Sequence, residues 1–117
     1  MKPAPVKRLV SFEVLEKLDI RVGTIRSVEE VPGSRKLVGL TVDFGDHTRT
    51  ILSGMKGERE DLGELVGRQT LFVVNLEPRK MAGVTSEGML LDLGYADGIA
   101  PALAIPERAI PDGTRAG

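Results

Sequence analysis

Residues 75–86 carry the side chains of this chain that are best suited to contact a polyanion. The segment reads Asn-Leu-Glu-Pro-Arg-Lys-Met-Ala-Gly-Val-Thr-Ser. Its lysine and arginine can pair with phosphates, and its amide and hydroxyl groups can hydrogen-bond to phosphates, sugar hydroxyls or base edges. Apolar runs, residues 70–74 and 89–93, lie on either side and have the length of strands. The segment is therefore predicted to be a binding surface on a rigid scaffold and not a catalytic centre.

Other candidate contact residues lie elsewhere in the chain. Two adjacent cations follow a Pro-Gly turn, one serine ends an expected strand, and one arginine is expected to project from the first strand. A methionine in the central segment can pack on a sugar or a base face. The predicted contact residues are thus cations, small polar residues and this methionine: Arg21, Arg35, Lys36, Ser53, Asn75, Arg79, Lys80, Met81 and Ser86.

Each of these residues also has a purely structural interpretation. Asn75 ends a strand that is expected to be buried, so its amide could instead satisfy backbone groups of the loop. The two serines could be turn hydrogen-bonders, and the two lysines could be ordinary solvated residues. The arginines have acidic neighbours with which they could pair, namely Glu77 or Glu87 for Arg79 and Asp19 or Glu87 for Arg21.

Catalytic chemistry has little support in the sequence. The chain has no cysteine and one histidine, so neither a Cys–His nucleophile nor a multi-histidine metal site can be built. Ser53-Gly54 is not embedded in a nucleophile elbow, and no glycine spacing matches a dinucleotide-binding or phosphate-binding loop. His47 is expected to be solvated beside a tight turn, and the acids between residues 58 and 64 on a solvated face. We therefore expect no enzymatic activity, no cofactor and no metal.

Composition sets the outer limits. A chain of 117 residues with 41% hydrophobic residues fits one domain with one core. The absence of cysteine, of a signal peptide and of a long apolar segment fits a cytoplasmic protein with no membrane segment. Sixteen Lys and Arg against seventeen Asp and Glu give a net charge of −1, so a polyanion site requires segregated charges. Aromatic residues make up only 3%, and the phenylalanines are expected on apolar faces, which argues against a base-stacking platform.

The hydrophobic pattern predicts mostly strands. Strands are expected at residues 20–28, 38–44, 47–53, 70–75 and 89–93, with a glycine bulge at Gly23 in the first and a short helix within residues 58–66. Residues 1–10 are expected to form a flexible arm, and residues 11–117 a single domain that begins with a helical turn capped by Ser11. Residues 99–117 look like an extension packed on this domain. The order of strands and helix predicts an all-β, five-stranded OB-fold barrel.

Several motifs resemble the tRNA-binding domain found as free-standing small proteins and attached to methionyl-tRNA synthetase. The matching stretches, in family order, are Asp19–Ile25, Lys36-Leu37, Val42-Asp43 with Gly45, Leu52–Gly54, Leu65–Gly67 and Asn75–Leu91. The resemblance covers about residues 12–115. It implies an OB-fold that binds the outside corner of L-shaped tRNA, as a homodimer when no synthetase is attached.

One departure from the family pattern matters. Where many members carry His-Pro-Asn-Ala-Asp-Lys-Leu, this chain has Val31-Pro-Gly-Ser-Arg-Lys-Leu37, which loses the histidine and the acid and gains a cation at Arg35. A related branch, the secretion chaperone CsaA, usually lacks the Ser-Gly pair seen at Ser53-Gly54. The sequence therefore predicts a non-catalytic tRNA-binding homodimer that assists an aminoacyl-tRNA synthetase in trans. The alternative is a CsaA-like module that binds unfolded polypeptides.

Overall fold

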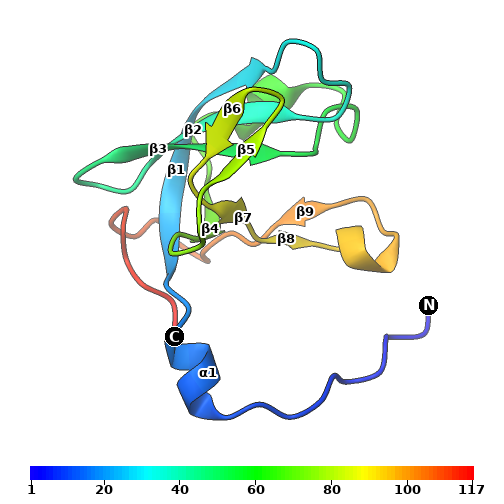
Figure 1. Ribbon diagram of the computed structural model, residues 1–117, viewed down its shortest axis with the longest axis vertical. Coiled ribbons are helices and arrows are strands. Elements are labelled where there is room, and N and C mark those ends of the chain that lie inside the picture. Colours follow the sequence, from blue (N-terminus) through cyan, green and yellow to red (C-terminus); the bar gives the residue numbers. More distant parts are fainter.

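The computed structural model describes all 117 residues and contains a curled antiparallel sheet (Figure 1). The sheet has five strands in the order β3-β2-β1-β4-β7. This confirms the predicted mostly-β architecture and its OB-like strand plan. The strands are β1 Ile20–Glu30, β2 Val38–Asp43, β3 Thr48–Ser53, β4 Gln69–Val73 and β7 Met89–Leu90.

The first strand is long enough to pair with two neighbours in succession. Residues 20–24 pair with β4 and residues 24–30 pair with β2. The strand bends at a register shift between Ile25 and Ser27, so the bulge predicted at Gly23 lies further along the strand. Gly23 instead permits a close approach, because a Cβ there would collide with the side chains of Val42 and Phe44.

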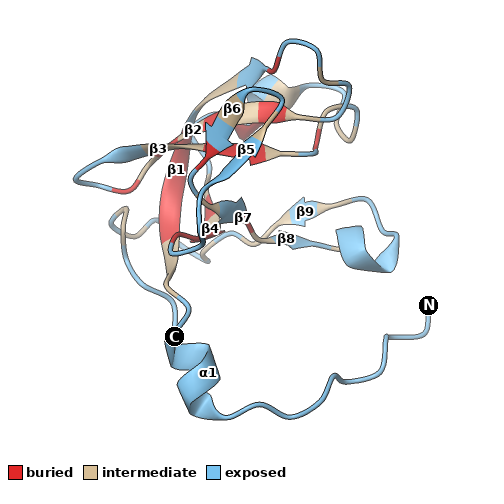
Figure 2. Ribbon diagram, viewed as in Figure 1, coloured by how far each residue is buried: buried red, intermediate tan, exposed pale blue.

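The core lies inside the curl of the sheet, as the buried segments in Figure 2 show. Strand β2 alternates buried and half-buried residues along its length, which is the period expected of a strand with one face in the core. Ile25, Leu40 and Ile51 are completely buried there. Phe72 meets the ring of Phe44 edge to face, with 5.6 Å between the ring centroids. Each such side chain contributes about 1.5–3 kcal/mol when fully buried.

The helix predicted within residues 58–66 is shorter than expected. It is a single 3-10 turn, η1 Leu62–Leu65, whose preceding Asp61 accepts a hydrogen bond from the Gly63 backbone N–H at 2.9 Å. Glycines at positions 57, 63 and 67 disfavour a longer α-helix, and those at 57 and 67 have positive φ. Leu65 reaches the core, but Val66 is 48% exposed because the turn ends before it.

The segment predicted to be a binding loop contains a hairpin. Strand β5 Arg79–Met81 pairs with β6 Val84–Ser86, and the two residues between them, Ala82 and Gly83, both have positive φ. Two positive φ values are what a type I′ turn requires, and this turn matches the twist of the flanking strands. This hairpin was not predicted, because Ala-Gly is a weaker turn signal than Asn-Gly.

The C-terminal extension packs on the barrel, as predicted. A small hairpin of β8 Asp92–Leu93 and β9 Ala102–Leu103 encloses a second 3-10 turn, η2 Tyr95–Asp97. The expected single strand 89–93 is therefore divided between two sheets. The final residues then run beside β1, where the Val22 N–H donates to the Thr114 carbonyl at 2.9 Å and the Gly113 N–H donates to the Val22 carbonyl at 2.8 Å. This tail covers the part of β1 that β2 does not reach.

The N-terminal residues lie outside the barrel. The predicted helical turn is present as α1 Phe12–Glu16, and it buries no residue. Ser11 occupies its N-cap position, but the predicted capping is wrong, because the Ser11 side chain forms no capping hydrogen bond. Phe12 is 81% exposed, so the expectation that it lies on a buried apolar face was wrong. Residues 1–10 have no regular structure and are exposed throughout (Figure 2). The division into a flexible arm, residues 1–10, and a folded domain, residues 11–117, stays a prediction.

The turn after β2 makes stability sensitive to acid. The Gly45 N–H, at 2.7 Å, and the Arg26 guanidinium hold the pKa of Asp43 below its ordinary value. The unfolded chain therefore binds more protons in the acid range, and the stability that Asp43 contributes is present above about pH 4 and is lost as pH falls through its folded pKa.

We expect Asp43→Asn to flatten the acid limb of stability between about pH 2.5 and 6, measured by urea unfolding. Asp97→Asn, which removes no side-chain hydrogen bond, is the control. An unchanged acid limb in Asp43→Asn would contradict the assignment.

Candidate nucleic-acid interface

The β5–β6 hairpin presents one exposed cation on each of its faces. Its register pairs Arg79 with Ser86, Lys80 with Thr85 and Met81 with Val84. Lys80 and Thr85 are exposed, whereas Met81 is half-buried and Ser86 is buried, so Lys80 stands on the solvent face. Arg79 shares the inner face but remains exposed at the start of the hairpin. Cations on both faces allow the hairpin to follow a phosphate backbone on either side.

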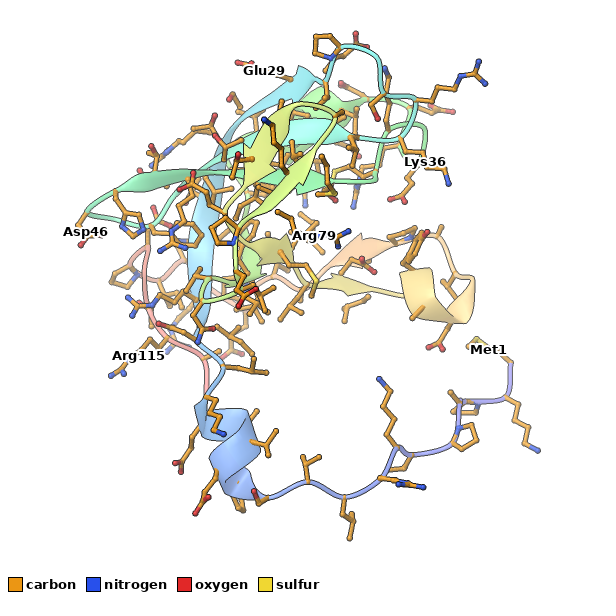
Figure 3. All side chains as sticks on the ribbon, viewed as in Figure 1. Met1, Glu29, Lys36, Asp46, Arg79 and Arg115 are labelled. Atoms are coloured by element: carbon orange, nitrogen blue, oxygen red, sulfur yellow. The ribbon has the colours of Figure 1, made fainter.

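The loop between β1 and β2 holds the other two predicted cations. Ser34 fixes its backbone, because its hydroxyl oxygen accepts from the Leu37 N–H at 3.0 Å. The Lys56 N–H donates to the Lys36 carbonyl at 3.0 Å, which ties the loop to the turn after β3. The side chains of Arg35 and Lys36 stay exposed. Figure 3 shows Lys36 and Arg79 on one side of β1, away from Asp46 and Arg115.

None of these four cations has an acidic partner. Arg35, Lys36, Arg79 and Lys80 form no ion pair, and Glu87 instead accepts from the Thr50 N–H at 3.2 Å. Other cations of the barrel are paired: Arg26 with Asp43, Lys56 with Glu30 and Arg59 with Glu64. An unpaired exposed cation can bind a phosphate without first breaking an ion pair.

Ser86 and Asn75, two of the predicted contact residues, make structural hydrogen bonds. Ser86 is 4% exposed, and its hydroxyl accepts from the Leu52 N–H at 3.0 Å and donates to the Gly88 carbonyl at 3.1 Å. A hydroxyl so enclosed cannot reach a ligand, so the direct contact predicted for Ser86 is corrected to a role in closing the barrel. Asn75 accepts from the Asp19 N–H at 2.8 Å and donates to the Lys17 carbonyl at 2.6 Å.

Arg21 forms the ion pair with Asp19 that was the structural alternative for this residue. Its guanidinium donates to both carboxylate oxygens of Asp19, at 2.8 and 3.0 Å, and this hydrogen bonding holds the pKa of Asp19 below its ordinary value. The pair also raises the pKa of Arg21. Binding a phosphate through Arg21 would require exchange of this bidentate pair, which makes Arg21 a weaker candidate than the unpaired cations.

Ser53 and Met81 retain surfaces that a ligand could contact. Ser53 ends β3 half-buried, and its hydroxyl forms no side-chain hydrogen bond within the chain. Met81 is half-buried on the hairpin. Met89, the first residue of the apolar run 89–93, is 46% exposed, and its neighbour Leu90 is buried in the core.

Arg49 is the residue that the sequence analysis missed. Its Nη1 donates to the Val74 carbonyl at 2.5 Å and to the Glu87 carbonyl at 3.1 Å. These carbonyls lie just before and just after the segment that contains the hairpin, so one guanidinium on β3 fixes both ends of that segment. The only sequence signal is an arginine inside a strand. The requirement for it comes from two carbonyls that are far apart in the chain.

His47 supports Arg49 and is more than a solvated turn residue. Its Nε2 accepts from the Arg49 Nε at 3.1 Å, so its Nδ1 carries the proton directed at Asp46, 2.6 Å away. That hydrogen bond lowers the pKa of Asp46. The imidazole also stacks on Phe44, with 5.6 Å between centroids. The residues around this arginine enclose a small cleft of about 160 Å³, lined by Asp19, Arg21, Phe44, His47, Arg49, Val74 and Asn75.

Most of the chain matches one known protein family. The family described as "Putative tRNA binding domain" matches residues 20–115, which include both the β1–β2 loop and the β5–β6 hairpin. The chain belongs to this tRNA-binding domain family. The match begins at β1, so residues 1–19, including α1, precede it.

Two relatives of this tRNA-binding domain are much longer proteins that contain a segment similar to it. A methionine–tRNA ligase of Bacteroides fragilis is 41% identical over 113 residues, which cover 97% of this chain and 16% of the ligase. One from Methanococcus maripaludis is 43% identical over 107 residues, which cover 92% of this chain and 16% of that ligase. The chain thus spans about one sixth of the length of these relatives.

Solved structures share the fold over nearly the whole chain. A methionyl-tRNA-synthetase-related protein of Pyrococcus horikoshii superposes with a TM-score of 0.86 at 34% identity and covers 95% of this chain and 100% of its own. The chaperone CsaA of Bacillus anthracis reaches 0.80 at 30% identity and covers 94% and 100%. Both branches named in the sequence analysis are therefore structural neighbours of this domain. The helices are all too short to serve as membrane spans.

The role of Arg49 can be tested through the hairpin. Arg49→Ala leaves the Val74 and Glu87 carbonyls without this donor, so we expect a loss of about 1–3 kcal/mol in the free energy of unfolding. We also expect faster amide hydrogen exchange in β5 and β6. Arg68→Ala, which removes one exposed hydrogen bond to Glu64, is the matched control. Wild-type exchange in the hairpin of Arg49→Ala would show that other contacts hold it.

Proposed function

We propose that this domain binds tRNA without catalysing a reaction, through the shape and the phosphates of the tRNA. The observation that carries the proposal is the group of four exposed, unpaired cations, Arg35, Lys36, Arg79 and Lys80, in a member of the tRNA-binding domain family. Side chains of this type position an RNA backbone and carry no sequence information of their own.

The chemistry of the neighbouring side chains supports backbone recognition. Ser53 offers a free hydroxyl and Met81 a flexible apolar side chain beside the cations, which suits sugar and base-face contacts. Phe44 and Phe72 are buried, so neither can stack on a base. The proposed contact set is therefore Arg35, Lys36, Ser53, Arg79, Lys80 and Met81, with Arg21 and Asn75 at its edge.

The relatives suggest where such binding would be used. Methionine–tRNA ligases contain a segment homologous to this chain. We propose that the domain delivers or retains tRNA for an aminoacyl-tRNA synthetase in the cytoplasm, acting in trans. A methionine–tRNA ligase is the synthetase class that the relatives favour.

A homodimer would extend the surface available to one tRNA. The outer side of β1 and β4 carries an apolar groove of about 560 Å³, lined in part by Leu71, Leu93, Leu103 and Ile105. Helix α1 exposes further apolar side chains, with Phe12 81% and Leu15 53% exposed. Exposed apolar surface of this extent favours association. A second copy that covers this groove would leave the β5–β6 hairpin of each copy free.

The same groove supports a second candidate function. Eight of its ten lining residues are hydrophobic, so an extended apolar peptide could occupy it. The CsaA chaperones, which are structural neighbours, keep this alternative in view. Binding should be compared across total tRNA, a plain RNA hairpin and an unfolded polypeptide. No tRNA binding at low salt, together with retained polypeptide binding, would replace the first function with the second.

The phosphate contacts predict a specific salt dependence. We expect Lys80→Ala to weaken binding to all tRNAs alike, by about eightfold at 0.1 M salt, and to reduce the slope of log affinity against log salt by about 0.7–0.9. Filter binding over a salt series measures both quantities. Arg108→Ala is the matched control, because Arg108 is exposed and paired with Glu107 on the C-terminal extension. Equal effects of the two variants would exclude a specific contact from Lys80.

The proposed dimer makes a separate prediction. Ile105 lines the apolar groove and is 56% exposed, so a charge there should be tolerated in the monomer. We expect the wild type to sediment as a dimer at micromolar concentration and Ile105→Asp to sediment as a monomer with an unchanged far-ultraviolet spectrum. A wild-type monomer that still binds tRNA would remove the dimer from the proposal.

A further inference from the structure

Residues 1–10 form an exposed basic segment with no hydrogen bond or ion pair to the rest of the chain. The segment contains Lys2, Lys7 and Arg8 and no acidic residue. None of its residues is buried, and it takes part in no hydrogen bond or ion pair. Figure 1 shows it extending to one side of α1 as a separate stretch of chain outside the barrel. No role in the fold accounts for its cations.

The segment changes the charge balance of the molecule. It holds three of the 16 cations and none of the 17 acids, so residues 11–117 carry thirteen cations against seventeen acids. The folded body thus has a net charge of −4 while the segment has +3. A polyanion that approaches the folded body is repelled by its net negative charge except near the β1–β2 loop and the β5–β6 hairpin. This repulsion extends over a Debye length of about 8–10 Å. A tethered cationic segment offsets that repulsion locally.

We propose that Met1–Val10 is a second RNA-contact element, which lies along the backbone of bound tRNA and pairs Lys2, Lys7 and Arg8 with phosphates. The inference rests on the proposed tRNA binding. Ten extended residues span about 33 Å, which is similar to the 31–40 Å dimensions of the whole molecule. The segment can therefore reach phosphates beyond those that face the hairpin.

The local chemistry favours a nucleic acid over an anionic membrane. Pro3 and Pro5 interrupt helix formation, so the segment cannot form the continuous basic amphipathic helix that lies on lipid. Its cations are also fewer than the four to eight typical of segments that recognise acidic lipids. The helix that follows carries Glu13 and Glu16, which an anionic surface would repel. An extended chain with spaced cations suits a phosphate backbone.

The test removes the cations from the full chain without shortening it. Lys2→Ala, Lys7→Ala and Arg8→Ala are combined in one variant, and total tRNA is titrated over a salt series. We expect the slope of log affinity against log salt to fall by about 2–2.7, and affinity at 0.1 M salt to fall on the order of 100-fold. Thermal unfolding should be unchanged, because the segment is exposed and forms no hydrogen bond or ion pair with the barrel.

Two matched variants separate position from total charge. The charge-conserving combination of Lys2→Arg, Lys7→Arg and Arg8→Lys should keep the wild-type slope. The combination of Lys17→Ala, Arg68→Ala and Arg108→Ala removes the same charge from exposed sites elsewhere, and we expect its slope to fall by less than 1. Equal losses in this combination and in the segment variant would overturn the inference.

The remaining outcomes distinguish this inference from the proposed function. If the segment variant binds tRNA with wild-type slope while Lys80→Ala weakens binding, the inference fails and the proposed function stands. If the wild-type chain binds no tRNA, both fail. If phosphatidylserine vesicles bind the wild type but not the segment variant, and the tRNA slope is unchanged, the segment is a membrane contact and the inference is overturned.

Discussion

The structure depends on one strand that serves two neighbours. Strand β1 pairs with β4 over residues 20–24 and with β2 over residues 24–30, and the bend between Ile25 and Ser27 turns a flat sheet into a curled one. Two further features follow from this bend. The inner face can enclose a core around Ile25 and Phe72, and the end of β1 that β2 does not reach needs another partner, which the tail around Thr114 supplies.

Closure of the curl determines where the candidate interface lies. The Glu87 N–H donates to the Thr50 carbonyl at 2.8 Å, and the buried Ser86 hydroxyl ties the same segment to Leu52. The base of the β5–β6 hairpin therefore lies where β3 is hydrogen-bonded to Ser86 and Glu87. Arg49 fixes both ends of the segment that contains this hairpin, through the Val74 and Glu87 carbonyls. A rigid closure thus holds a short element whose own cations remain free, which is the arrangement expected when a scaffold presents a binding loop.

Apart from Arg21, the cations that support the fold are not the ones proposed to bind RNA. Arg21, Arg26 and Arg59 are paired with acids, and Arg49 donates to carbonyls, so these residues contribute to the fold. The cations of the β1–β2 loop, the β5–β6 hairpin and the segment before α1 form no ion pair and no side-chain hydrogen bond. Net charge alone, at −1, conceals this separation. Family membership and geometry together make the unpaired cations the candidate tRNA contacts.

The sequence by itself determined the strand plan and the polar segment that carries the candidate interface, because period-two apolar patterns and turn residues are local signals. It also identified Arg79 and Lys80, whose exposure follows from a polar segment between apolar strands. Only the tertiary structure decided which polar residues are free. Ser86 and Asn75 are occupied by backbone groups up to 58 residues away, and the carbonyls that Arg49 satisfies lie 25 and 38 residues from it. Such pairings depend on how the sheet curls and closes, and no local pattern encodes that geometry.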